Sequence, residues 1–105
     1  MSEINTVLLS GEVLTVKQNF TSDGTIFIVF TLKQRILKFA KGELIESSYM
    51  SYLCNCFENG RFKLSDIKVG NSLVVQGSLS TYIKKNIINT SINVEKIYVT
   101  RVAEN

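Results

Sequence analysis

Histidine, proline and tryptophan are absent from this chain of 105 residues, and cysteine occurs only twice. Without histidine, the chain cannot build a Ser-His or Cys-His catalytic arrangement or a metal site with histidine ligands. Two cysteines are too few for a four-cysteine zinc site. The absence of proline excludes a proline-rich linker or recognition segment. We therefore expect neither a bound metal ion nor a cofactor.

Long apolar runs are also missing. No run approaches the roughly 18 residues of a membrane-spanning helix, and the amino terminus has neither the basic leader nor the apolar stretch of a signal peptide. We therefore expect a cytoplasmic protein with no membrane partner. The length and the 45% hydrophobic content predict a single domain over residues 1–105, with a core over about residues 4–99.

The charge is mildly basic. Twelve Lys and Arg residues stand against nine Asp and Glu residues, which gives a net charge of +3 and a pI of about 9.0. This balance favours an anionic partner without identifying one.

What the chain does contain is typical of strands. Val, Ile, Thr, Tyr and Phe recur in short runs that Gly, Asn, Asp and Ser interrupt. We predict five strands, over about residues 6–17, 25–35, 47–57, 72–82 and 87–99. Gly11 predicts a bulge or bend that lets the first strand serve two faces of a small barrel. Asp23-Gly24 predicts a tight hairpin turn, and the Lys84-Lys85-Asn86 segment predicts another.

Two segments are predicted to lie outside the strands. Residues 36–46 are expected to form a loop. Residues 58–70 are expected to form a short helix or an irregular crossover, with Phe62 closing one end of a barrel. Three strands, a crossover and two more strands is the order of a five-stranded oligonucleotide/oligosaccharide-binding (OB) barrel, which is all-β. An SH3-like barrel is the alternative.

Alternation along the strands predicts the core. Ile26, Ile28, Phe30 and Leu32 share one face of the second strand, and Leu73, Val75, Gly77 and Leu79 share the inward face of the fourth. In the third strand Ser51 and Asn55 indicate that the face with Tyr49, Leu53 and Phe57 is wetter. Cys54 and Cys56 lie on its other face, as small core residues in a reducing compartment.

Three phrases resemble the bacterial single-stranded DNA-binding protein (SSB) family. They are Asn5-Thr6-Val7-Leu8-Leu9-Ser10-Gly11, Phe30-Thr31-Leu32, and the stretch from Val69-Gly70-Asn71-Ser72 to Gly77-Ser78-Leu79. Their order covers nearly the whole chain. The chain departs from the family in lacking its stacking tryptophans and its flexible acidic tail. In these respects it is similar to a relative, primosomal replication protein N (PriB).

The resemblance implies an OB domain that binds single-stranded DNA and assembles as a homodimer or homotetramer. It implies work in DNA replication, repair or replication restart, with replication or primosome proteins as possible partners and a place at the nucleoid. General strand protection, primosome assembly and service to a plasmid or phage all remain open.

Binding of a single strand needs cations for the phosphates and aromatic faces for the bases. The end of the second strand, the loop after it, the wetter face of the third strand and the last hairpin supply both. The candidate nucleic-acid-binding residues are Phe27, Lys33, Arg35, Lys38, Phe39, Lys41, Tyr49, Phe57, Tyr82, Lys84 and Lys85.

Other interpretations stay open. Phe27 fits base stacking and packing in a subunit interface equally. The basic segments also fit ordinary solvated turns, so an OB-fold interaction subunit without nucleic-acid binding is one alternative, and an RNA-binding OB protein is another. The carboxylates are scattered over turns and loops, so we expect no catalytic residues.

Overall fold

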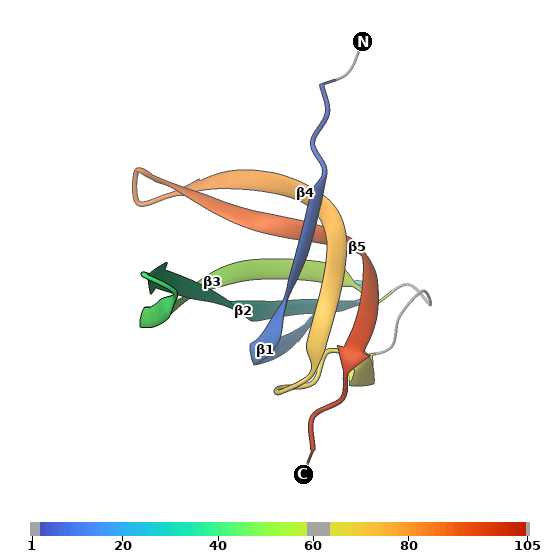
Figure 1. Ribbon diagram of the computed structural model, residues 1–105. Helices are drawn as coiled ribbons and strands as arrows, with labels where there is room; N and C mark the ends of the chain where they lie inside the picture. Colours follow the sequence, from blue (N-terminus) through green and yellow to red (C-terminus); the bar gives the residue numbers. More distant parts are fainter. Residues whose placement is uncertain (1–2, 59–63, 105) are drawn as a thin grey trace.

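Five strands closed into a barrel form the protein (Figure 1). The computed structural model describes residues 3–58 and 64–104. The strands are β1 (Val7–Phe20), β2 (Ile26–Ala40), β3 (Glu43–Phe57), β4 (Ser72–Lys84) and β5 (Ile87–Arg101). Their order around the barrel is β1-β2-β3-β5-β4, and a 3-10 turn, η1 (Leu64–Asp66), lies in the crossover between β3 and β4. The predicted all-β, five-stranded OB barrel is therefore confirmed.

β1 serves two neighbours. Its first half pairs with β4, from Val7 to Glu12, and its second half pairs with β2, from Glu12 to Phe20. The pairing with β2 is irregular between Val13 and Thr15. A side chain at Gly11 would place its Cβ 2.8 Å from the carbonyl oxygen of Lys33. Gly11 thus permits the backbones of β1 and β2 to approach closely. The irregularity predicted at Gly11 lies instead between Val13 and Thr15.

The turn between β1 and β2 is held by Asp23. Its carboxylate accepts a hydrogen bond from the Thr21 hydroxyl and another, of 3.0 Å, from the Thr25 backbone N–H. Gly24 has a φ of 86°, which favours glycine. These hydrogen bonds, that of Thr21 first, lower the pKa of Asp23 to about 2. The tight turn predicted from Asp23-Gly24 is therefore present.

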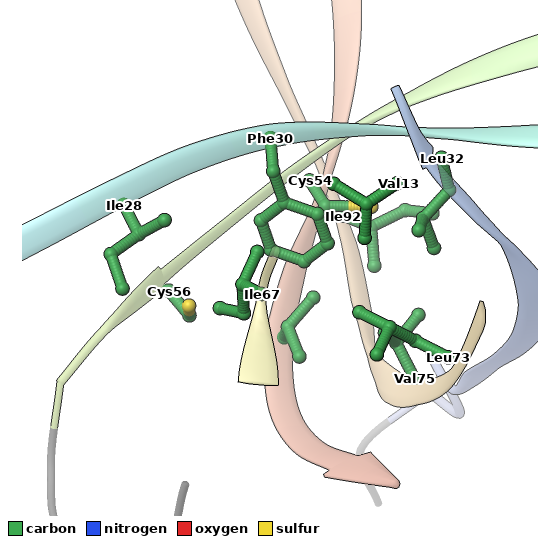
Figure 2. Close-up of a cluster of buried hydrophobic side chains, with 11 residues drawn as sticks. Val13, Ile28, Phe30, Leu32, Cys54, Cys56, Ile67, Leu73, Val75 and Ile92 are labelled. Atoms are coloured by element: carbon green, nitrogen blue, oxygen red, sulfur yellow. The ribbon is translucent and has the colours of Figure 1, made fainter. Parts of the chain in front are cut away.

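The core fills the barrel with side chains from every strand (Figure 2). Phe30, Ile28 and Leu32 of β2 are fully buried, as the alternation predicts. Cys54 and Cys56 are buried and free, and Ile67, just after η1, is buried at one end of the barrel. The further buried hydrophobic residues are Val13, Leu73, Val75, Ile92 and Val94.

Two residues expected in the core are not observed there. Leu79 is 47% exposed, so its predicted inward position is wrong: β4 has left the barrel by this residue. Phe62, expected to close the barrel end, lies outside the described residues.

The expected loop over residues 36–46 is also wrong. β2 continues to Ala40 and β3 begins at Glu43, so only Lys41 and Gly42 join them. Both have positive φ, 55° and 79°, which is the pattern of a type I′ hairpin turn. Lys85 and Asn86 join β4 to β5 in the same way, with φ of 53° and 64°. Among the described residues, no helix has the length and apolar character needed to cross a bilayer.

Candidate nucleic-acid interface

Two hairpins extend beyond the barrel on the same side (Figure 1). We call residues 33–51 the β2–β3 arm and residues 79–92 the β4–β5 arm. β3 and β5 pair only at Cys54 with Ile92 and at Asn55 with Asn93. Beyond these two pairs the strands separate, and a groove opens between the arms.

The groove consists of two adjoining hollows that share Leu53 and Ser91. The first has a volume of about 300 Å³ and is lined by Ser51, Tyr52, Leu53, Leu79, Thr90, Ser91 and Ile92. The second has a volume of about 280 Å³ and is lined by Phe27, Val29, Leu53, Asn55, Tyr82 and Ser91. Four strands contribute to the second hollow, so strand pairing fixes its shape.

Two of the predicted aromatic residues line the second hollow, and a third packs against one of them. Phe27 and Tyr82 line it from β2 and β4. The ring of Phe57, the cross-strand partner of Phe27, lies 4.9 Å from the Phe27 ring at an interplanar angle of 45°. Phe57 and Tyr82 are 51% and 43% exposed. The cluster therefore offers accessible aromatic surface whose position is fixed by packing.

Tyr49 combines an aromatic face with nearby cations. The Nζ of Lys33 lies 5.1 Å from the centre of the Tyr49 ring, within the range of a cation–π contact. Arg35 is the direct cross-strand partner of Tyr49. Tyr49 keeps 59% of its surface exposed, so the ring remains accessible.

The other predicted basic residues do not lie together on the face that carries Lys33 and Arg35. Lys38 has the opposite parity to Lys33 and Arg35 along β2, so it lies on the other face of the arm. Phe39, 62% exposed, and Lys41 lie at the tip of this arm. Lys84 and Lys85 lie at the tip of the β4–β5 arm. The predicted set thus occupies both arms rather than one compact patch.

Charge on the groove side has one sign. The outward positions of the described β2 and β3 residues carry no carboxylate; they are Phe27, Val29, Thr31, Lys33, Arg35, Leu37 and Phe39, and Tyr49, Ser51, Leu53, Asn55 and Phe57. From Ser72 to Val94 the sequence has no charged residue except Lys84 and Lys85. An anionic backbone would meet no like charge along this surface.

Sequence reasoning missed several residues of this surface. Asn55 donates a 3.2 Å hydrogen bond from Nδ2 to the Ser91 Oγ, which lies 3.3 Å from the Ser80 Oγ. Lys17 of β1 is the cross-strand partner of Val29 and is exposed. The alternation placed Val29, Leu53 and Asn55 on the outer face. Their meeting with Ser91 depends on the pairing of β3 with β5, for which the sequence carries no local signal.

Reactive chemistry is not assembled at this groove. Burial raises the pKa of Cys54 and of Cys56 to about 12, so both thiols are protonated at neutral pH, and they point into the barrel (Figure 2). Within residues 3–58 and 64–104, no three His, Cys, Asp or Glu side chains cluster as a metal site. The arrangement suits noncovalent binding.

Comparison with known proteins supports the architecture. No family model and no curated protein matches the sequence. Among solved structures, the chain is similar to the Plasmodium falciparum SSB in complex with ssDNA, with a TM-score of 0.74, 19% identity, and coverage of 94% of this chain and 96% of that chain. It is similar to the dimeric N-terminal domain of PriB from Thermoanaerobacter tencongensis, with a TM-score of 0.65, 18% identity, and coverage of 93% and 98%.

A third similar structure is a deletion mutant of the single-stranded DNA-binding protein from Thermus aquaticus. Here the TM-score is 0.72 and the identity 14%, and the match covers 93% of this chain and 51% of that chain. At such low identity these likenesses concern the fold. The chain therefore has an SSB-like OB fold, shared with SSB and PriB proteins.

Proposed function

We propose that this chain binds single-stranded DNA with little sequence preference and acts in DNA replication, repair or replication restart. The observation that carries the proposal is the groove side of the two arms. There, exposed aromatic rings and cations share a surface without carboxylates, on a fold similar to that of an SSB in complex with ssDNA.

The physical basis is stacking combined with phosphate contacts. A base stacked on an aromatic ring contributes roughly 1–3 kcal/mol, whatever its identity, because every base has a π-face. Tyr49, Phe57 and Tyr82 offer such rings. Lys33, Arg35 and the lysines at the arm tips supply charge along a strand that follows the groove. Sequence tolerance follows because neither kind of contact reads a base edge.

Self-association belongs to the same proposal. Leu8 of β1 and Tyr98 of β5 are 71% and 56% exposed, and both lie on the outer face of the sheet formed by β1, β4 and β5, where Leu8 pairs with Gln76 and Tyr98 with Val74. Exposed apolar surface of this kind is typical of interfaces. We therefore propose a homodimer or homotetramer located at the nucleoid in the cytoplasm. Replication or primosome proteins are its proposed partners.

The first experiment measures fluorescence anisotropy of a labelled oligo-dT of about 30 nucleotides, with a duplex of equal length as control. We expect binding to the single strand at low salt, with log affinity falling against log salt by about 0.7 per phosphate contact. Duplex binding should be weak. Competition by oligo-U would show whether RNA is bound as well.

A charge variant tests the arm tips. The double variant Lys84→Gln/Lys85→Asn removes two cations, and asparagine tolerates the positive φ of Lys85. We expect weaker binding and a salt slope shallower by about 1.4, if each lysine contacts one phosphate. The matched control is Lys68→Gln/Lys96→Gln, because both lysines are exposed and lie away from the arms. Equal effects of the two double variants would contradict the assignment.

One feature favours a second candidate function. Ile83, Ile87 and Ile88 at the tip of the β4–β5 arm are 74%, 63% and 71% exposed, and exposed apolar groups of this kind mark protein-binding surfaces. If the wild-type protein binds no single strand at low salt, the chain is better described as an OB-fold interaction subunit.

A further inference from the structure

We propose that β4 joins two copies of this chain by pairing, antiparallel, with β4 of a second copy. The contact is the edge of β4 that faces away from β5, from Ser80 to Lys84, which we call the free β4 edge. This inference goes beyond the proposed function, because the interface is separate from the outer face around Leu8 and does not depend on nucleic-acid binding.

The free β4 edge begins where the pairing with β1 ends. β1 pairs with β4 only as far as Val7 with Gly77. The side-chain amide of Asn5 takes the next position: its Nδ2 donates to the Leu79 carbonyl oxygen at 2.8 Å, and its Oδ1 accepts from the Leu79 N–H at 2.9 Å. Beyond Leu79 the arm projects away from β1 (Figure 1), and no strand of the described chain pairs with this edge.

Thr81 and Ile83 direct their backbone polar groups to this edge. β4 pairs with β5 without irregularity from Ser78 to Lys84, and successive residues of such a strand point their N–H and C=O to opposite edges. Because Leu79 faces the side of Asn5, Thr81 and Ile83 do so as well. Both are exposed, so within the described chain these groups are left to water.

The free β4 edge lacks the features that protect other strand edges. Proteins usually guard an unpaired edge with charged residues or proline. The part of β2 beyond its pairing with β1 carries Arg35 and Lys38, and β3 begins at Glu43. From Leu79 to Ile83, β4 has neither a charge nor a proline. This edge therefore suits pairing with another strand.

A second copy of the same edge fits in one register. With the twofold axis at Tyr82, Thr81 of each copy faces Ile83 of the other, and these residues exchange backbone hydrogen bonds on both sides of the axis. Centring the axis on Thr81 would instead set Ile83 against Leu79, whose N–H and carbonyl oxygen are already bound to Asn5. The amide of Asn5 thus selects the register.

The side chains are compatible with this register. Ile83, 74% exposed in the single copy, would lie opposite another β-branched residue, Thr81. Tyr82 would lie beside Tyr82 of the second copy in the closer, non-hydrogen-bonded kind of pair. Lys84 would lie opposite Ser80, with the two Lys84 residues about 14 Å apart along the strands, beyond the screening length of about 8 Å. The resulting four-stranded sheet would support two arms that are two-stranded in the single copy.

Thr81→Pro tests the pairing, because it removes an N–H that the second copy needs and spares the hydrogen bonds of β4 with β5. The matched control is Thr90→Pro, since Thr90 is exposed and is the cross-strand partner of Thr81. Like Ile92, which pairs with β3, Thr90 directs its N–H to the groove edge of β5. Size-exclusion chromatography with light scattering measures the masses. We expect Thr81→Pro to have half the wild-type mass and Thr90→Pro to keep the full mass.

Two further comparisons sharpen the result. Ile83→Pro and Ile88→Pro repeat the test nearer the tip, at cross-strand partners that are 74% and 71% exposed, so they serve if a proline at Thr81 disturbs folding. Combining Thr81→Pro with Leu8→Glu separates the free β4 edge from the proposed interface on the outer face. We expect this double variant to be monomeric.

The proposal is overturned by a monomeric wild type, or by Thr81→Pro and Ile83→Pro variants that keep the wild-type mass. It is also overturned if both members of each proline pair lose mass equally, because the arm rather than the free β4 edge would then be responsible. Anisotropy with oligo-dT on the same samples judges the proposed function separately. A wild type that binds no single strand, but whose mass is halved by Thr81→Pro, would contradict that function and leave this interface in place.

Discussion

At the scale of single residues, Gly77 shows how closely β4 and β5 approach each other. A Cβ at this position would overlap the carbonyl oxygen of Asn93, which belongs to the backbone and cannot move aside alone. The pairing of β4 with β5 is irregular between Gln76 and Gly77, where the backbones come together. Only glycine therefore fits at this position, because any side chain would overlap the backbone of β5.

We predict that Gly77→Ala lowers the free energy of unfolding by about 2–3 kcal/mol, the upper part of the range of roughly 1–3 kcal/mol for overpacked sites, because the overlapping atom belongs to the backbone. Gly24→Ala is the comparison, because Gly24 has a positive φ but open space around it. It should cost only about 1 kcal/mol of backbone strain. Urea denaturation measures both values, and a larger loss for Gly24→Ala would contradict the prediction.

The two cysteines give a second prediction at this scale. Burial raises the pKa of Cys54 and of Cys56 to about 12, from the 9.0 of an ordinary cysteine thiol. Because the folded pKa exceeds the unfolded one, the linked stability is intact below about pH 9 and declines as the pH rises toward 12. We expect an aromatic disulfide reagent at about pH 8 to react slowly with the native protein. In denaturant both thiols should react rapidly, and rapid reaction of the native protein would show that the core is open.

At the scale of elements, the turn between β1 and β2 predicts a dependence on pH. The pKa of Asp23 is lowered to about 2, first by the Thr21 hydroxyl and then by the Thr25 backbone. A lowered pKa means that the ionised form stabilises the fold, fully above about pH 4 and progressively less as the pH falls toward 2. Asp23→Ala should therefore lower Tm at neutral pH. The difference from wild type should shrink toward pH 2.

Thermal melts of both proteins at several pH values measure this effect. Ser22→Ala, a change at the exposed neighbour in the same turn, is the control and should show no such convergence. A constant difference in Tm from neutral pH to about pH 2 would show that Asp23 acts through something other than its charge.

The elements also show what the sequence can predict and why. Inside the barrel one face of each strand is buried, so Ile28, Phe30 and Leu32 alternate with outward residues and the strand is recognisable. Beyond the barrel both faces of the β2–β3 arm meet solvent. Leu37 on one face and Met50 on the other are both exposed there, so neither face requires a regular alternation of apolar and polar residues. That is why the sequence predicts a loop over residues 36–46, although Lys41 and Gly42 alone form the turn.

Part of the candidate site can likewise be predicted from the sequence, and part of it cannot. Outward aromatics such as Phe27, Phe57 and Tyr82 could be identified from parity within their own strands. The hollow between them could not, because Asn55 and Ser91 are brought together by pairing between strands far apart in sequence. Nearness along the chain predicts one site for Lys33 and Lys38, whereas strand parity places them on opposite faces of the arm.

At the scale of the whole molecule, the exposed outer face of β1, β4 and β5 predicts the oligomeric state. We expect Leu8→Glu to shift the proposed homo-oligomer toward monomer, because a carboxylate buried in an interface loses its hydration without a partner. Size-exclusion chromatography with light scattering measures the mass. Leu44→Glu is the matched control, since Leu44 is 54% exposed at the tip of the β2–β3 arm. A wild type that is monomeric at high concentration would contradict the proposed assembly.

The short pairing of β3 with β5 also bears on how the chain folds. β2 with β3 and β4 with β5 are each joined by two residues, so both hairpins have local contacts and can form quickly. Closing the barrel requires Cys54 of β3 to pair with Ile92 of β5, which lies thirty-eight positions further along the chain. Few hydrogen bonds between β3 and β5 stabilise this pairing until the core packs around it. The chain entropy lost on closing the barrel therefore opposes the step before the stabilising contacts have formed. Barrel closure, rather than formation of either hairpin, should therefore limit the folding rate.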